Sequence, residues 1–518
     1  MSREKSSPIQ LSDHFTYRRL LRFVYPSIVM MIFTSIYTVV DGLFVSNFVG
    51  KTPFAALNLI YPYIAIFGTL GFMFGSGGSA LVSKTLGEGR TQKARRYFSL
   101  IVYTALVSGI LLAVIGVATV PAVARLLGAE GDLLSYSILY GRILVCATPL
   151  FVLQNVFQSF FVTAEKPKLG LLVIVLAGCT NIVLDFLFIA VLGFGLAGAA
   201  AATAIAQAVG GLFSLLYFIW CRPQTVQRRS SPVRSRADSS ASRIRAGKET
   251  TCQPDSFPSD CGSSPTATGT LDCSSEQTSA NIPASAPARQ SSCLLYLTAT
   301  TLEGRVLLQC CHNGLSEFVS NMSMSAVNML YNYQLMKFAG ENGVSAFGVV
   351  QYVAFFFLAV FLGYAIGCSP IIGYHYGAQN VSELQNMFRK SLILMFVSGI
   401  CMTVLAIGLA VPFSRLFVGY DAELLALTTR ALRLYAISYM LAGFNIFGSS
   451  FFTALNNGNV SAAISILRLF GFQSLAVFLL PALIGLNGIW LAAPFAELLT
   501  LAVTIFFFLK MRSRYHYA

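Results

Sequence analysis

The sequence predicts an all-α polytopic membrane protein with twelve transmembrane helices in two six-helix bundles, and three observations lead to this. The 518 residues are 55% hydrophobic and only 11% charged, and the mean hydropathy is +0.69. Apolar stretches of about 20 residues or more, enough to span ~30 Å of hydrocarbon, recur along the chain. The two halves of the chain also resemble each other. A soluble globular chain of this length does not combine these properties.

Each half of the chain contains six apolar stretches. In the first half they cover residues 20–46, 54–83, 97–120, 136–162, 169–192 and 196–221. In the second half they cover residues 312–338, 344–372, 388–412, 426–454, 461–484 and 488–510. The two bundles are therefore expected at residues 20–221 and 302–510, with residues 1–19 and 511–518 as polar ends. The first stretch is too long for a signal-peptide core and is expected to stay in the membrane.

A polar segment separates the bundles. Residues 222–301 are rich in Ser, Thr, Pro and Ala and show no hydrophobic period, so we expect a disordered linker. Its end becomes apolar again, and residues 294–309 are expected to form a surface helix that leads into the seventh span.

The basic residues predict the orientation of the chain. They follow every second apolar stretch or precede the first: Arg18, Arg19, Arg22, Lys84, Arg90, Lys93, Arg95, Arg96, Lys166, Lys168, Arg389, Lys390, Lys510, Arg512 and Arg514. By the positive-inside rule, both termini and the linker are cytoplasmic, in the inner or plasma membrane of the cell. This pattern accounts for the net charge of +14 without a nucleic-acid partner. The expected partner is the lipid bilayer, and a monomer is expected.

An internal repeat relates the two halves at an offset of 290 residues. Gly87 aligns with Gly377, Asn155 with Asn445, and the run "GLAG" from Gly195 with "GLNG" from Gly485. Because each copy contains an even number of spans, both copies enter the membrane from the same side, as in transporters built from parallel repeats. The charged positions have diverged. Asp41 aligns with Tyr331, Asp185 with Ala476, Gly178 with Arg468 and Gln207 with Glu497.

Polar side chains in the first bundle form the candidate cation site. A carboxylate inside a spanning helix is unfavourable by about 2.5 to 3.5 kcal/mol, so it faces the bundle interior or a cavity. Asp41 and Asp185 are such acids, and Asn181 lies one helical turn before Asp185. Thr203 and Asn155 offer further oxygens at similar depth. An all-oxygen set suits Na⁺, and the carboxylates equally suit a proton. Hydrogen bonding between helices is the alternative role for each acid.

The second bundle contains a different polar set. The candidates for a substrate cleft are Glu317, Asn328, Asn332, Asn445, Arg468 and Glu497. Arg468 and Glu497 are expected to pair, and such a buried pair can serve packing alone.

Catalysis and cofactors are not expected. The four histidines lie near predicted helix ends, and no nucleophile and base or cluster of metal ligands accompanies them. Metal binding is therefore limited to Na⁺ at Asp41 and Asp185. The eleven cysteines are scattered, so no disulfide framework is expected.

Several segments resemble the multidrug and toxic compound extrusion (MATE) family of cation-coupled antiporters. They are "PSIVMMIFTSIYTVVDGLFVSNFVG" from Pro26, "SKTLGEG" from Ser83, "NIVLDFLFI" from Asn181, "NGLSEFVSNMSMS" from Asn313 and "NGIWLAAPFAELLT" from Asn487. The resemblance implies alternating access between two bundles and export of cationic or amphipathic compounds in exchange for H⁺ or Na⁺. It also implies that Asp41, Asn181 and Asp185 form the cation site.

Two other functions remain open on the sequence alone. A flippase for lipid-linked oligosaccharides or cell-wall precursors can share this architecture, but several basic cleft residues would then be expected for pyrophosphate, and Arg468 is nearly alone. A membrane receptor or scaffold would use the long linker as its docking segment.

Overall fold

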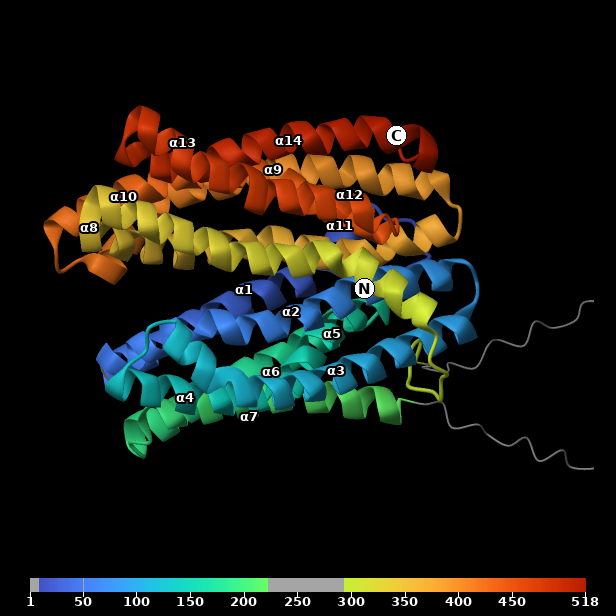
Figure 1. The fold of residues 1–518 in the computed structure, drawn as a ribbon. Helices are drawn as coiled ribbons and strands as arrows, with labels where there is room; N and C mark the ends of the chain where they lie inside the picture. Colours follow the sequence, from blue (N-terminus) through green and yellow to red (C-terminus); the bar gives the residue numbers. More distant parts are fainter. Residues whose placement is uncertain (1–8, 50, 222–292) are drawn as a thin grey trace, which may run out of the picture. The chain divides into compact units, whose positions relative to one another are not determined.

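The computed structural model describes residues 9–49, 51–221 and 293–518, and this part of the chain is almost entirely helical. The first half contains α1 (Tyr17–Phe48), α2 (Lys51–Gly87), α3 (Thr91–Leu126), α4 (Gly131–Cys146), α5 (Thr148–Thr163), α6 (Pro167–Asp185), the π-helical turn η1 (Phe186–Val191) and α7 (Gly195–Trp220). Figure 1 shows these helices side by side, from blue to green along the chain.

The second half repeats this order of elements. It contains α8 (Gly304–Gly377), α9 (Val381–Val418), α10 (Ala422–Ala436), α11 (Tyr439–Ala454), α12 (Gly458–Ser465), the π-helical segment η2 (Ile466–Gln473), α13 (Ser474–Ile484) and α14 (Leu486–Tyr515). The linker expected to be disordered lies, up to residue 292, outside the described residues.

The helices account for all twelve expected spans. Within the described residues, nine helices are long and apolar enough to cross a membrane, and the bent pair α4 and α5 makes a tenth candidate. The 74 residues of α8 contain a break at Gly340, where φ is 58°, a left-handed conformation that glycine adopts readily. This break separates the expected seventh and eighth spans. The pair α10 and α11 corresponds to α4 and α5.

Glycines allow the two halves to meet backbone to backbone. A Cβ atom on Gly77 of α2 would overlap the carbonyl oxygen of Cys310 of α8, and one on Gly314 would overlap that of Met73. Close approach of helices through small residues is typical of membrane proteins, because backbone contact replaces a hydrophobic driving force between helices.

The repeat mates Gly87 and Gly377 lie at one further contact of this kind. A Cβ atom on Gly87 would overlap the carbonyl oxygen of Tyr374, and one on Gly377 would overlap that of Lys84. The internal symmetry therefore places the same residue type on both sides of the contact between α2 and α8.

An N-terminal arm, residues 9–16, connects the two halves at the end where the chain begins. The backbone N–H of Leu11 donates to Glu165 Oε1 of the first half (2.7 Å), and that of Phe15 donates to Glu383 Oε1 of the second half (2.8 Å). His14 Nδ1 lies 2.6 Å from Glu383 Oε2. Leu11 and Phe15 are fully buried, so the arm is packed into the protein as well as hydrogen-bonded.

Residues 293–303 differ from the sequence prediction. They form an extended segment rather than the expected surface helix, and α8 begins only at Gly304. Arg95 of α3 explains the difference, because its Nε donates to the Leu294 carbonyl (3.0 Å) and its guanidinium stacks on the Tyr296 ring. The docked segment also brings Cys293 beside Cys221, with a Cα–Cα distance of 5.9 Å.

Candidate functional site

The two acids of the first half, Asp41 and Asp185, lie against each other. Asp41 is on α1, and Asp185 is the fully buried last residue of α6. Their carboxyl groups are close enough to interact electrostatically. No donor group of the described residues hydrogen-bonds either oxygen of Asp185 or Oδ1 of Asp41. Two ionised carboxylates repel each other at short range, so neutralising one of them stabilises the pair.

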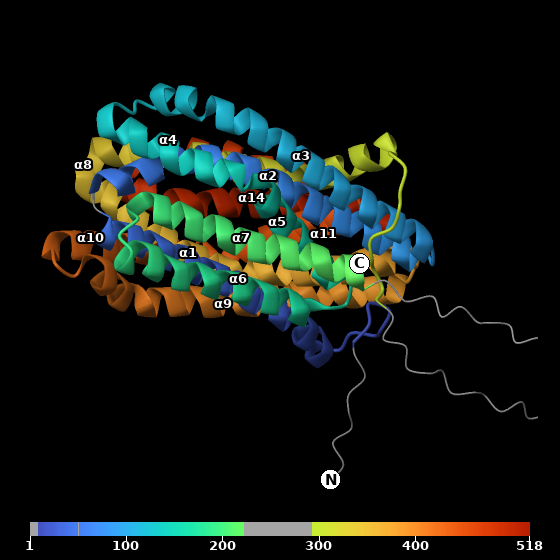
Figure 2. The ribbon, with the colours of Figure 1, turned by 90° about the horizontal axis from the view of Figure 1, so that it is seen from below.

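Gly178 explains why this face of α6 meets α1. Gly178, Asn181 and Asp185 lie at helical positions i, i+3 and i+7, and therefore on one face. A Cβ atom on Gly178 would overlap the rings of Phe33 and Tyr37 of α1, so α1 packs directly on the glycine. Figure 2 shows α1 and α6 as neighbours. In the second half the aligned residue is Arg468, which excludes this close approach.

The other expected cation ligands are placed around α6. Asn181 Nδ2 donates to Thr203 Oγ1 of α7 over 3.4 Å, so the structure brings these two residues together. Asn155 lies on α5 with 6% of its surface exposed, and its Nδ2 has no hydrogen-bond partner among the described residues. Each side chain offers an oxygen that a hard cation such as Na⁺ can bind.

Sequence reasoning missed several polar neighbours of this site. Tyr37 lies one turn before Asp41, and Gln154 of α5 lies close enough to interact with its hydroxyl. Tyr61 of α2 and Tyr140 of α4 lie within electrostatic range of Asp41. The spacing of Tyr37 and Asp41 was a readable signal, because residues four apart share a helix face. The other residues come from separate helices, and no spacing in the sequence marks them.

The second half contains a closed polar network in place of the acid pair. Arg468 of η2 donates to Glu497 Oε1 of α14 through Nε (2.8 Å) and Nη2 (2.7 Å). Asn445 Nδ2 of α11 donates to Glu497 Oε2 (2.7 Å) and to the Glu497 carbonyl (2.9 Å). Thr504 Oγ1 donates to Asn445 Oδ1 (2.9 Å). Both carboxylate oxygens of Glu497 are therefore satisfied, and the network needs no further ligand.

The repeat makes the contrast between the halves direct. Asn155 and Gln207 occupy the positions that align with Asn445 and Glu497. Asn445 and Glu497 are bonded to each other, whereas Asn155 Nδ2 and Gln207 Oε1 are buried and unpartnered within the described part of the chain. These aligned positions are thus open to a ligand in the first half, whereas in the second half the pair of Asn445 and Glu497 is saturated.

The remaining candidates for a substrate cleft, Glu317, Asn328 and Asn332, all lie on α8. Glu317 lies within electrostatic range of Arg468 and so belongs to the second network by charge. Asn328 Oδ1 accepts a hydrogen bond from Gln351 Nε2 (2.6 Å), which joins the two parts of α8. Asn332 is exposed.

A repeated six-helix architecture with a buried pair of carboxyl groups defines a membrane transporter. A sequence model of the MatE family matches residues 26–187 and 318–479, and the second match begins 292 residues after the first. The chain belongs to the MatE family of multidrug efflux transporters. Its members are transporters and not enzymes.

Characterised relatives extend over nearly the whole chain. A "Multidrug export protein MepA" from Staphylococcus haemolyticus is 22% identical over 96% of this chain and 94% of the relative. The protein of the same name from Staphylococcus saprophyticus is 20% identical over 92% of this chain and 88% of the relative.

Solved structures show the same fold. A MATE structure in complex with MaL6 superposes with a TM-score of 0.79 at 20% identity, and a MOP superfamily transporter from Pyrococcus furiosus superposes with 0.77 at 21% identity. Each comparison covers 99% of both chains. The fold class expected from the sequence is therefore confirmed.

Proposed function

We propose that this chain is an antiporter that exports cationic or amphipathic organic compounds by alternating access, driven by entry of H⁺ or Na⁺. The observation that carries the proposal is the Asp41 and Asp185 pair, since Oδ1 of Asp41 and both oxygens of Asp185 are buried without a donor among the described residues. Relatives named as multidrug export proteins support small organic compounds as the cargo. Asn181 and Thr203, already in contact beside the pair, supply the nearest neutral oxygens.

The mechanism follows from linkage between two ligands of one bundle. A cation at the acid pair neutralises one negative charge and stabilises the packing of α1 on α6. If the organic substrate favours the other packing, each ligand weakens the binding of the other by the same factor. The bistable element is α1, which approaches α6 through Gly178.

The membrane potential supplies enough free energy for export. One monovalent cation that moves inward gains about 2.3 kcal/mol per 100 mV, or roughly a 50-fold drive, before any concentration gradient is added. Export of a monovalent cationic compound moves one charge outward, so the potential drives its efflux when two cations enter per cycle, and with one cation the drive is the concentration gradient of the ion.

The orientation and the assembly are part of the proposal. The basic residues after every second span place both termini on the cytoplasmic side of the cell membrane. The N-terminal arm, which joins Glu165 and Glu383, then lies at the cytoplasmic end of the two bundles. We propose that the monomer is the transporting unit, because each monomer contains both bundles.

The two alternative functions are less well supported. A flippase for pyrophosphate-linked lipids needs free cations in its cleft, and Arg468 is already paired with Glu497. A scaffold would depend on the linker, and deletion of residues 225–290, which leaves the docked segment from residue 293 intact, tests this, since a transporter should keep its flux without them.

The deciding experiment measures ethidium efflux in inverted membrane vesicles, with a proton gradient or a sodium gradient imposed separately. The natural chain should transport with one of the two gradients, and the Asp41→Asn, Asp185→Asn double variant should lose the gradient-driven flux. Asp132→Asn is the matched control, because Asp132 lies exposed in the first turn of α4. Full transport by the double variant would refute the proposed coupling site.

A further inference from the structure

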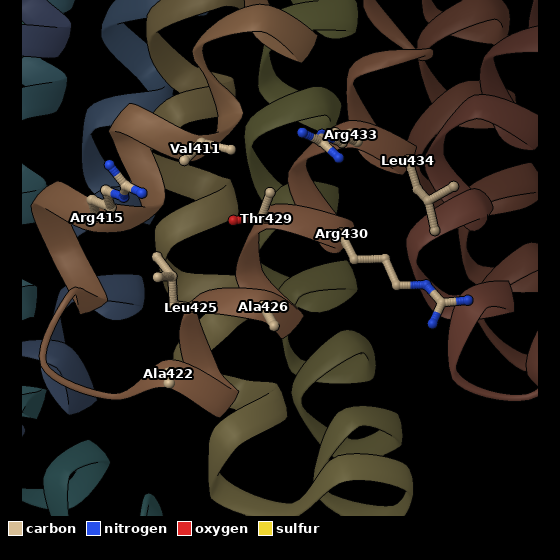
Figure 3. A pocket seen from close by; sticks show the side chains of 9 residues that line it. All are labelled: Val411, Arg415, Ala422, Leu425, Ala426, Thr429, Arg430, Arg433 and Leu434. Atoms are coloured by element: carbon tan, nitrogen blue, oxygen red, sulfur yellow. The ribbon is translucent and has the colours of Figure 1, made fainter.

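A basic groove lies between α9 and α10, away from both polar clusters. Its volume is about 520 Å³. Arg415 of α9 and Arg430 and Arg433 of α10 supply the charge, and Val411, Leu425 and Leu434 supply apolar wall. Figure 3 shows Arg415 and Arg433 on the two sides of the groove, with Arg430 extending along its rim. The groove therefore combines cationic groups with an apolar surface.

The three guanidinium groups have no carboxylate partner in the described part of the chain. The ion pairs found there involve His14, Arg19, Arg90 and Arg468. The nearest acids by sequence are at the start of α10, and Asp421 is engaged there as N-cap, accepting from the backbone N–H groups of Glu423 and Leu424. All three arginines are exposed. They are therefore available to an external anion.

The positions of the three arginines along their helices limit which kind of anion can bind them. Arg415 lies three residues before the end of α9, whereas Arg430 and Arg433 lie eight and eleven residues after Ala422, the first residue of α10. At 1.5 Å per residue these positions are about 12 and 16 Å along the helix. The charges thus extend from the membrane surface into the depth of one leaflet, where an unpaired arginine is unfavourable.

We propose that this groove binds the phosphate headgroup of an anionic membrane lipid, with an acyl chain against its apolar wall. A guanidinium group binds phosphate through two parallel hydrogen bonds, and the membrane supplies lipid phosphate at the depth of Arg415. Long arginine side chains extend toward the headgroups from deeper positions, so Arg430 and Arg433 add positive charge below the level of Arg415.

The first half provides a matched comparison. The stretch "RLLGAEGDLL" from Arg125 aligns with "RLFVGYDAELL" from Arg415 with one extra residue in the second half. Arg125 and Arg142 then correspond to Arg415 and Arg433, while Leu139 takes the place of Arg430. Both first-half arginines are exposed. They test whether any arginine at this depth binds lipid or whether the third arginine and the groove are required.

The experiment measures binding of fluorescent phosphatidylglycerol to the full-length protein in phosphatidylcholine nanodiscs. We expect the Arg415→Gln, Arg430→Gln, Arg433→Gln triple variant to lose at least ten-fold in affinity. The Arg125→Gln, Arg142→Gln double variant should change less than two-fold. Each of the three single glutamine variants should lose part of the affinity, which keeps the test decisive if the triple variant does not fold.

Three results would overturn the proposal. The first is equal retention of fluorescent phosphatidylglycerol and fluorescent phosphatidylcholine by the natural chain. The second is natural affinity in the triple variant or in all three single variants. The third is displacement of the lipid by glycerol phosphate at a matching concentration, which would assign the groove to a soluble anion. The inference does not depend on ion coupling, since lipid binding is measured without transport.

Discussion

The network of Arg468, Glu497 and Asn445 allows a quantitative prediction about stability. Replacing Arg468 by Met keeps an unbranched side chain of similar length but removes both hydrogen bonds to Glu497 Oε1. Glu497 then keeps only the donor from Asn445 on its other oxygen. The variant therefore leaves a carboxylate in the bundle with a hydrogen-bond donor on only one of its two oxygens.

The expected magnitude follows from the burial of the pair. The side chains of Arg468 and Glu497 are only 16% and 10% exposed. Little solvent can therefore hydrate the Glu497 carboxylate once Arg468 is replaced. Removing one partner of a buried ion pair lowers the free energy of unfolding by about 3 to 5 kcal/mol. The residual exposure favours the low end, about 3 kcal/mol, which is roughly a 100-fold change in the folding equilibrium.

The double variant Arg468→Met, Glu497→Met should recover most of this loss. Replacing a whole buried pair by apolar side chains is often close to neutral, and Asn445 Nδ2 still donates to the carbonyl of residue 497. A coupling free energy of at least about 2 kcal/mol between the two substitutions is therefore expected.

Tryptophan fluorescence in mixed detergent micelles measures this prediction as the fraction of dodecyl sulfate is raised. The chain has two tryptophans, so a Trp220→Phe background leaves the fully buried Trp490 of α14 as reporter. Arg142→Met is the control, because Arg142 is exposed. If Arg468→Met unfolds at the same detergent fraction as this control, or if the double variant is the least stable of all, the reasoning about the network is wrong.

Three further predictions concern packing and pH. Gly77→Ala should separate α2 from α8, since its Cβ overlaps the Cys310 carbonyl, and thermal unfolding should then show no stable fold. Gly348→Ala is the control, because its Cβ meets open space. It should stabilise its helix by about 1 kcal/mol. Phe15→Ala should release the N-terminal arm, because Phe15 is fully buried. Its truncation should lower the stability of the docked arm by about 3 kcal/mol. The arm should then be cleaved faster by a protease, and an unchanged cleavage rate would contradict the prediction. Burial raises the pKa of the Glu165 carboxyl, so its contribution to stability is present below the unfolded pKa and is lost as pH rises through the folded pKa. The free energy of unfolding should therefore fall as pH rises in that window, which thermal unfolding measures, and Glu165→Gln should remove this component.

Hydropathy and the internal repeat were sufficient to predict the architecture. A span is recognised from the local composition of about 20 residues, and the alignment of Gly87 with Gly377 already indicated two related halves. The break at Gly340 and the two-part spans α4 with α5 and α10 with α11 were not predicted, because a bend depends on the packing of neighbouring helices as well as on local residues.

The partners of the site residues could not be predicted from the sequence as fully as the architecture. The sequence singled out Asp41 and Asp185 as buried acids and paired Arg468 with Glu497, but it did not show that Asn445 completes the second network. It also grouped Asn328 and Asn332 with that network, although Asn328 bonds to Gln351 and Asn332 is exposed.

The sequence alone thus determined which segments enter the membrane, how the halves are related and which residue types are unfavourable there. Tertiary structure alone decided the facing of Asp41 on Asp185, the attachment of the N-terminal arm and the placement of three arginines around one groove between α9 and α10. The physical reason is that membrane insertion depends on the summed hydrophobicity of a segment. Side-chain partnership depends on the rotation of each helix about its axis, which changes by a third of a turn when packing shifts by one residue.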